Sequence, residues 1–177
     1  AVGQNYFMEM AKMRAYRVLW ANIAKAYGAK EENAKMLIHA FNAQINMSLY
    51  DSYVNMLRTT TGSMSAILGG VHSFSVTPFD MVYEPTTEFA ERIARNQQLI
   101  LKEESHFDKV ADPAAGSYYI ENLTDSLVKA AWNLFLQIQE EGGYLAALRN
   151  GTIQKMVKES ATKRLNNVAT RREIILG

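Results

Sequence analysis

The sequence has no cysteine, three prolines and three histidines among its 177 residues. The lack of cysteine excludes disulfides, cysteine-ligated zinc, iron–sulfur clusters and thiol nucleophiles, and it fits a reducing, cytoplasmic setting. The near absence of net charge, +1, argues against nucleic-acid or membrane-surface binding driven by overall charge. No run of roughly 18 apolar residues occurs, so we expect no membrane-spanning helix.

Neither a starting methionine nor a basic, signal-like segment opens the chain at Ala1. We therefore expect this sequence to be a piece of a longer protein. Its 48% hydrophobic content suffices for a packed core and suits one domain of ordinary size.

Helical patterns alternate with short apolar segments, which is typical of βα units and a parallel sheet. A Ser48-x-x-Asp51 spacing resembles a capping box, and Thr87 can cap a later helix. The fourth helix opens at Asn122 or Thr124. The predicted helices span residues 6–27, 48–68, 87–100, about 122–141, 144–149 and 153–170.

Three short apolar segments are predicted to be strands: Met36–Ile38, Val71–Val76 and Lys109–Ala111. Together with the helices they make about three βα units, whereas a complete barrel has about 250 residues. The predicted fold class is therefore α/β, with residues 1–177 forming a single partial domain of about half a (β/α)8 barrel, helix-rich with short parallel strands.

Ligands of parallel barrels bind at the C-terminal ends of the strands, which here means residues 39–42, 72–77 and 112–117. His72 is the best single candidate, since an imidazole could donate to a carbonyl, although a structural histidine is the alternative. His39 and His106 have no partner at metal-ligand spacing, so we predict no metal site. For Arg58, Arg92 and Arg95, structural ion pairs are favoured over phosphate binding.

The last 34 residues are basic, and the sequence favours a solvated face, or one that meets an acidic partner surface, over nucleic-acid binding. The basic side chains belong to Arg149, Lys155, Lys158, Lys163, Arg164, Arg171 and Arg172, and the only acidic ones to Glu159 and Glu173.

Several words occur along the chain in a fixed order: R-T-T-x-x-x-M-S-A-x-x-G-G from Arg58, S-F-S-V-T-P-F-D from Ser73, P-T-T-E-F-A-E-R-I-A-R-N from Pro85, and V-A-D-P-x-x-G-S-Y-Y from Val110. In these words the chain resembles the barrel domain of the methylmalonyl-CoA mutase family, the adenosylcobalamin-dependent acyl-CoA isomerases. The resemblance covers almost the whole sequence and implies the C-terminal half of that barrel.

The resemblance breaks at polar positions that the family's catalytic chains use. After Gly69-Gly70, the family's Gln is His72, its His is Ser75, its Asn is Thr77 and its Glu is Met81. In the segment before the helix that contains R-T-T, the family's Arg, Ser, Gln and Trp correspond to Leu37, Ala40, Phe41 and Ile45. Within this helix, the family's Glu after R-T-T corresponds to Gly62. We interpret these as losses of hydrogen bonding and charge at ligand-facing positions.

This pattern resembles the small, non-catalytic subunit of the heterodimeric mutase. It implies no catalytic residues, no cofactor-binding residues and no metal, with His72, Ser75 and Thr77 as weak substrate-site candidates. The resemblance implies that adenosylcobalamin is bound by the larger catalytic partner, which interconverts methylmalonyl-CoA and succinyl-CoA. The family's cobalamin motif D-x-H-x-x-G does not occur in this sequence, and its absence says little about the subunit. The isolated fragment is expected to self-associate.

Two alternatives stay open: a catalytic cobalamin-dependent mutase with altered acyl specificity, and a ligand-free interaction module derived from a barrel. Fold alone does not separate the three.

Overall fold

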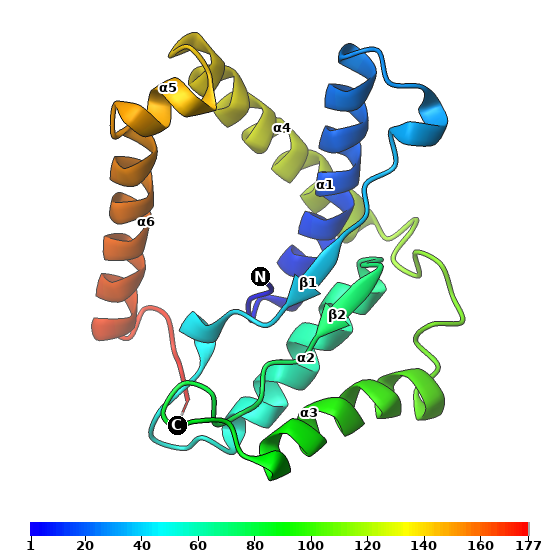
Figure 1. The fold of residues 1–177 in the computed structure, drawn as a ribbon, viewed down its shortest axis with the longest axis vertical. Coiled ribbons are helices and arrows are strands. Elements are labelled where there is room, and N and C mark those ends of the chain that lie inside the picture. Colours follow the sequence, from blue (N-terminus) through cyan, green and yellow to red (C-terminus); the bar gives the residue numbers. More distant parts are fainter. Residues whose placement is uncertain (177) are drawn as a thin grey trace. The chain divides into compact units, whose positions relative to one another are not determined.

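The computed structural model describes residues 1–176, which form two compact units, Ala1–Val128 and Lys129–Leu176. The division falls inside helix α4, Tyr118–Glu140. The course of the chain is drawn in Figure 1.

The first unit alternates helices with short strands. Its helices are α1 (Tyr6–Ala26), α2 (Val54–Leu68) and α3 (Glu88–Leu99), and its strands are β1 (His39–Phe41) and β2 (Ser73–Ser75). Short 3-10 turns cover Glu31–Asn33 (η1) and Gln44–Asn46 (η2), and a π-helical turn, Ile100–Glu104 (η3), extends α3. Two helix starts are capped by a side chain, Asn5 before α1 and Thr87 before α3.

Strands β1 and β2 pair in parallel, with His39 opposite Ser73 and Phe41 opposite Ser75. The middle residues of the strands face the helices, and Ala40 is 2% exposed. Val2, the second residue of the sequence, forms a parallel bridge with Asn42, directly after β1. The core gathers there from α1, α2, β1 and the N-terminus: Val2, Met13, Ile38, Ala40 and Ala66.

Helices α1 and α2 meet where α2 ends. A Cβ on Gly69 would lie 3.1 Å from the Cβ of Met13 and 3.2 Å from the Cα of Met10. These distances are tighter than most real contacts, so the Gly-Gly sequence lets the end of α2 approach α1. The helix pair covers one face of the strands (Figure 1).

The α/β class with short parallel strands is confirmed, whereas the barrel remains a prediction. The first predicted strand is shifted: β1 begins at His39, after the segment Met36–Ile38, because its pairing register with β2 starts there. The third predicted strand, Lys109–Ala111, is wrong. That segment forms turns and bends, Asp112 after it has a left-handed φ of 44°, and no strand in the described residues pairs with it.

Two helix starts also differ from the prediction. Helix α2 begins at Val54, and the Ser48 hydroxyl accepts from the Tyr50 N–H within the preceding loop, so the predicted capping box is wrong. Helix α4 begins four residues before Asn122, at Tyr118, since Gly116 and Ser117 complete the turn that precedes it.

The second unit contains the C-terminal part of α4, the short helix α5 (Tyr144–Arg149) and α6 (Thr152–Ala169). Gly142 and Gly143, with φ of 92° and 89°, separate α4 from α5, and Gly151, with φ of 83°, separates α5 from α6. These boundaries agree with the predicted ones to within a residue or two. Over residues 1–176, no helix combines the length and apolar character that crossing a membrane requires.

Candidate functional site

The exposed face of the two strands carries a cluster of polar side chains from His39, Ser73 and Ser75. His39 Nδ1 lies 2.8 Å from Ser73 Oγ, and its Nε2 lies 3.5 Å from Ser75 Oγ. All three residues are exposed. One imidazole thus bridges two hydroxyls, so these side chains bind one another across the sheet.

His72 lies at the opposite end of β2 from Ser75, next to the point where the strand begins. The ring Nδ1 of His72 accepts a hydrogen bond from the backbone N–H of Ile38 at 3.1 Å. The backbone N–H of His72 donates to the Ile38 carbonyl at 2.9 Å. The residue borders a hollow of about 240 Å³, shared with Lys102, Asp108 and others. The structural interpretation of His72 is the one that these bonds support, since the ring extends the strand pairing.

Thr77 is buried and bonds to Asn42. Its N–H donates to Asn42 Oδ1 at 3.1 Å, and its hydroxyl donates to the Asn42 carbonyl at 3.2 Å. Asn42 Nδ2 in turn donates to the Thr59 carbonyl in α2 at 3.3 Å. A Cβ on Gly62 would lie only 2.9 Å from Asn42 Nδ2, so the amide fills the space that a side chain at position 62 would need.

The positions where the sequence loses polar residues do not share one environment. Leu37 and Ile45 are 79% and 60% exposed, and the sulfur of Met81 accepts from Gln44 Nε2 at 3.4 Å. Ala40, Thr77 and Gly62 are buried between strands and helices. The interpretation of all of them as ligand-facing is therefore wrong for these three, because they fill the interior.

Asn55, in the first turn of α2, ties together the loops that follow both strands. It is 0% exposed. Its Nδ2 donates to the carbonyls of Ser48 (3.0 Å) and Phe79 (3.1 Å), and its Oδ1 accepts from the Ser48 N–H at 2.9 Å and from Arg58 Nη1 at 2.8 Å. A short polar chain, in which Thr59 and Ser63 contact the Gln97 amide at 3.1 and 3.2 Å, links α2 to α3. These loops are therefore held by buried hydrogen bonds.

Asp80, in the loop after β2, forms further buried hydrogen bonds. It is 1% exposed, and its Oδ2 accepts from the N–H and the hydroxyl of Thr87, both at 2.8 Å. Thr87 then caps α3 through the Ala90 N–H at 3.2 Å. The Asp that the sequence keeps after β2 thus fixes the start of α3.

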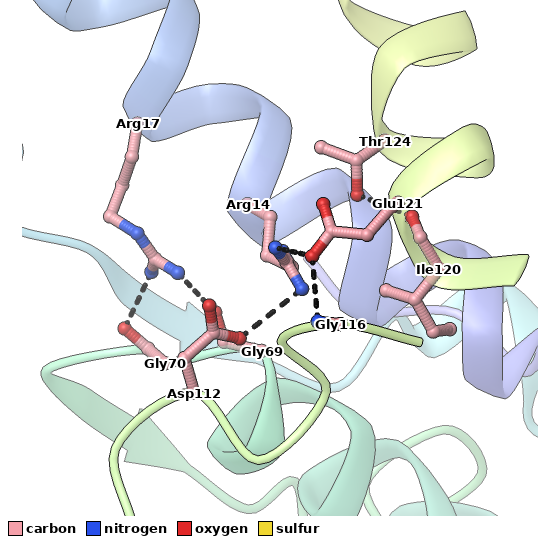
Figure 2. Close-up of polar contacts among 9 residues, drawn as sticks. All are labelled: Arg14, Arg17, Gly69, Gly70, Asp112, Gly116, Ile120, Glu121 and Thr124. Atoms are coloured by element: carbon pink, nitrogen blue, oxygen red, sulfur yellow. Dashed lines mark hydrogen bonds and ion pairs between the residues drawn. The ribbon is translucent and has the colours of Figure 1, made fainter. Parts of the chain in front are cut away.

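A second polar cluster joins α1 to the loop before α4 (Figure 2). Arg14 donates to Glu121 Oε1 at 2.7 Å and lies 3.3 Å from Asp112 Oδ1. The Gly116 N–H also donates to Glu121 Oε1, at 3.1 Å, and this bond and the Arg14 guanidinium lower the pKa of Glu121. The segment with the motif V-A-D-P-x-x-G-S is therefore held against α1 by these polar contacts.

Arg17 points from the same helix toward the end of α2 (Figure 2). Its two terminal nitrogens donate to the carbonyls of Gly69 and Gly70, each at 2.9 Å. Burial is the main cause that lowers the pKa of Arg17. A Cβ on Gly70, whose φ is 83°, would lie 2.9 Å from this guanidinium. The arginine thus satisfies the helix-terminal carbonyls.

Arg58 of α2 and Arg92 of α3 contact residues of their own helices. Arg58 binds Asn55, and the Arg92 guanidinium lies 5.5 Å from the centre of the Phe89 ring. Both contacts are structural, but neither of the two is an ion pair of the kind that the sequence favoured.

Sequence reasoning missed the His39–Ser73–Ser75 cluster and the role of Asn55. The cluster follows from the register that places His39 opposite Ser73, and with β1 predicted three residues too early that register could not be inferred. For Asn55 no local signal of this role exists, since its partners in the two loops lie 7 and 24 residues away.

Two parallel strands covered on one face by helices, with their C-terminal loops held by buried amides, place this unit in the α/β class. The family model described as methylmalonyl-CoA mutase matches residues 1–177. The chain belongs to the methylmalonyl-CoA mutase family.

Among its relatives is the methylmalonyl-CoA mutase small subunit of Porphyromonas gingivalis, 54% identical over 99% of this chain and 29% of that protein. The small subunit of Streptomyces virginiae is 42% identical over 100% of this chain and 29% of that protein. The large subunit of P. gingivalis is 38% identical, over 100% of this chain and 25% of that protein. The chain thus spans between a quarter and a third of the length of these relatives.

Proposed function

We propose that this chain is part of the non-catalytic small subunit of a heterodimeric methylmalonyl-CoA mutase. The larger subunit carries out the interconversion of methylmalonyl-CoA and succinyl-CoA, and this chain serves assembly and stability. The relatives support the pairing, because P. gingivalis has proteins named small subunit and large subunit that both match the chain.

The observation that carries the proposal is how the polar groups near the strand ends are used. The N–H and the hydroxyl of Thr77 both donate to Asn42. At the other end of β2, the His72 ring accepts a hydrogen bond from a backbone N–H. The residues left on the open strand face are His39, Phe41, Ser73 and Ser75, which include no arginine or lysine. An acyl-CoA carries several phosphates, and arginine and lysine side chains are common phosphate ligands in proteins.

The chain's residues do not fit cobalamin. A histidine that ligates a metal ordinarily has a carboxylate or carbonyl acceptor for its second ring nitrogen. His39 contacts two serine hydroxyls, and the His72 ring accepts the Ile38 N–H. The described residues include no group of three His, Asp or Glu side chains that could hold a metal ion. We therefore place the cofactor in the larger subunit and assign no step of the reaction to this chain.

The buried hydrogen bonds support a scaffolding role. Asn55, Asn42 and Asp80 fix the loops after the strands from inside, so this end of the domain keeps its shape without a ligand. Such preformed loops suit a protein–protein contact, where binding is stronger when little ordering is needed.

The test uses full-length small and large subunits, expressed separately and together. We expect isomerisation of methylmalonyl-CoA by the complex and none by the small subunit alone. Replacing His39 and Ser75 by alanine in the small subunit is expected to leave kcat of the complex unchanged, because the contacts of these side chains are within the His39–Ser73–Ser75 cluster.

A matched control replaces the large subunit's residues aligned with Leu37 and Met81 by Leu and Met. If the polar groups at these positions act in the large subunit only, this change lowers kcat while the small-subunit variant does not. Turnover by the small subunit alone, or a loss of kcat in its His39→Ala, Ser75→Ala variant, would show that this chain is catalytic.

A further inference from the structure

Helix α6 has one face that is polar along its whole length. Side chains recur there at three- and four-residue steps, which places them on one side of the helix. They line an open hollow of about 640 Å³, together with one residue from beyond the helix: Lys155, Lys158, Glu159, Thr162, Lys163, Asn166, Asn167 and Arg172. Four of these are cations and one is a carboxylate.

The segment after α6 completes this hollow because it folds back onto the helix. The N–H groups of Arg172 and Glu173 both donate to the Asn167 carbonyl, at 2.8 and 3.1 Å. The Glu173 carboxylate lies 3.2 Å from Arg164 on the helix. These contacts hold Arg172 beside the lysines, so the positive face extends past the last turn of the helix.

The charge of the chain is divided unevenly along the sequence. Residues 144–177 hold seven Lys and Arg against two Glu, a balance of +5, whereas residues 1–143 hold twelve against sixteen, a balance of −4. The net charge of +1 conceals this division. An excess of cations on an exposed helix face steers association with a negatively charged surface.

We propose that the polar face of α6 docks an acidic helix of the larger subunit, which rests on the function proposed above. The spacing carries the choice of partner. Lys155 and Lys163 are separated by about 12 Å along the helix at roughly 1.5 Å per residue. One phosphate group is much smaller than this span, whereas carboxylates repeated along a facing helix match it.

The kind of cation also favours a protein surface. Three of the four cations in the hollow are lysines, which act as hydrated, mobile point charges and lack the planar fork with which arginine clamps a phosphate. Lysines on an open face change the rate and salt dependence of association more than they change final affinity.

The test uses full-length small subunit with Lys155→Glu, Lys158→Glu and Lys163→Glu, and its association rate with the large subunit by stopped flow over a series of salt concentrations. We expect association at low salt to slow by on the order of tenfold and to depend less on salt. The control carries the same change of charge at lysines exposed in the first unit, Lys30→Glu, Lys35→Glu and Lys109→Glu, and is expected to associate within about twofold of wild type.

A wild-type pair that does not associate would overturn the proposed function. If the wild-type pair associates and the α6 variant matches the control, the docking proposal alone is wrong. A second variant, with Gln at the three α6 positions, is expected to show a smaller slowing of the same sign, and circular dichroism verifies that both variants are folded. Tight binding of inorganic pyrophosphate to the small subunit, with an unchanged association rate in the variants, would assign the hollow to a small anion and overturn the docking.

Discussion

The two units of this chain differ in how many of their side chains are buried. In the first unit, Ala1–Val128, polar side chains such as Asn55, Ser63 and Ser65 are 0% exposed, and hydrogen bonds satisfy them. In the second, Lys129–Leu176, α6 has no buried residue, and Ala147 is the buried residue of α5. The first unit therefore gains a specific arrangement from its own interior. The second is a set of helices with few buried side chains.

The exposed apolar residues of the second unit sharpen this difference. Leu145, Val157 and Leu165 are each more than 60% exposed. A helix whose apolar side is not buried draws little stability from packing, since most helix stability in proteins comes from that burial. Substitutions are thus expected to cost far more in the first unit than in the second.

The largest expected effect is from shortening Met13, which is 2% exposed in the core. Met13→Ala should lower the free energy of unfolding by about 3 kcal/mol, because it removes buried methylenes and leaves a cavity against Gly69. The control is Val157→Ala on α6, with an expected change below about 0.5 kcal/mol. Urea unfolding measures both, and equal losses in the two variants would erase the contrast between the units.

A smaller loss, about 2 kcal/mol, is expected for Asn55→Ala, because the Ser48 N–H and the carbonyls of Ser48 and Phe79 are left buried without this partner. Asn133→Ala, an exposed position of α4, serves as the matched control and is expected to be close to neutral. Hydrogen exchange adds a local readout, since the loops 44–53 and 76–87 should lose protection in the Asn55 variant alone. Unchanged protection there would mean that Asn55 does not hold the loops.

The smallest effect concerns pH. Hydrogen bonding to Gly116 and the charge of Arg14 lower the pKa of Glu121 from its ordinary value of 4.5. The ionised carboxylate therefore stabilises the fold above that value, and the contribution is lost as pH falls through the lowered pKa. Glu121→Gln should reduce Tm at about pH 7 and have less effect at about pH 3.

Glu140→Gln, at the exposed end of α4, provides the comparison in the second unit and should shift Tm little at either pH. A Glu121 variant whose loss of Tm is the same at both pH values would show that its carboxylate charge contributes nothing to stability.

Local signals in the sequence predicted most of the helices. Thr87 was identified as a cap because a hydroxyl at that position can accept the N–H three residues on, and the structure has this bond. The predicted bounds of α5, directly after the glycines 142 and 143, are those of the structure. Both features depend on residues only a few positions apart, and sequence reasoning is strongest at that range.

Of the candidate site, the sequence by itself determined less. It named Ser75 and Thr77 and kept both a functional and a structural interpretation of His72. It did not determine that Thr77 faces inward, that His72 bonds Ile38, or that His39 bridges two serines. The tertiary structure decided these, because each depends on the parallel register of β1 and β2 between residues 34 to 36 positions apart. Short strands carry too little pattern to fix that register, whereas the packing of α1 and α2 against one face of the strands does fix it.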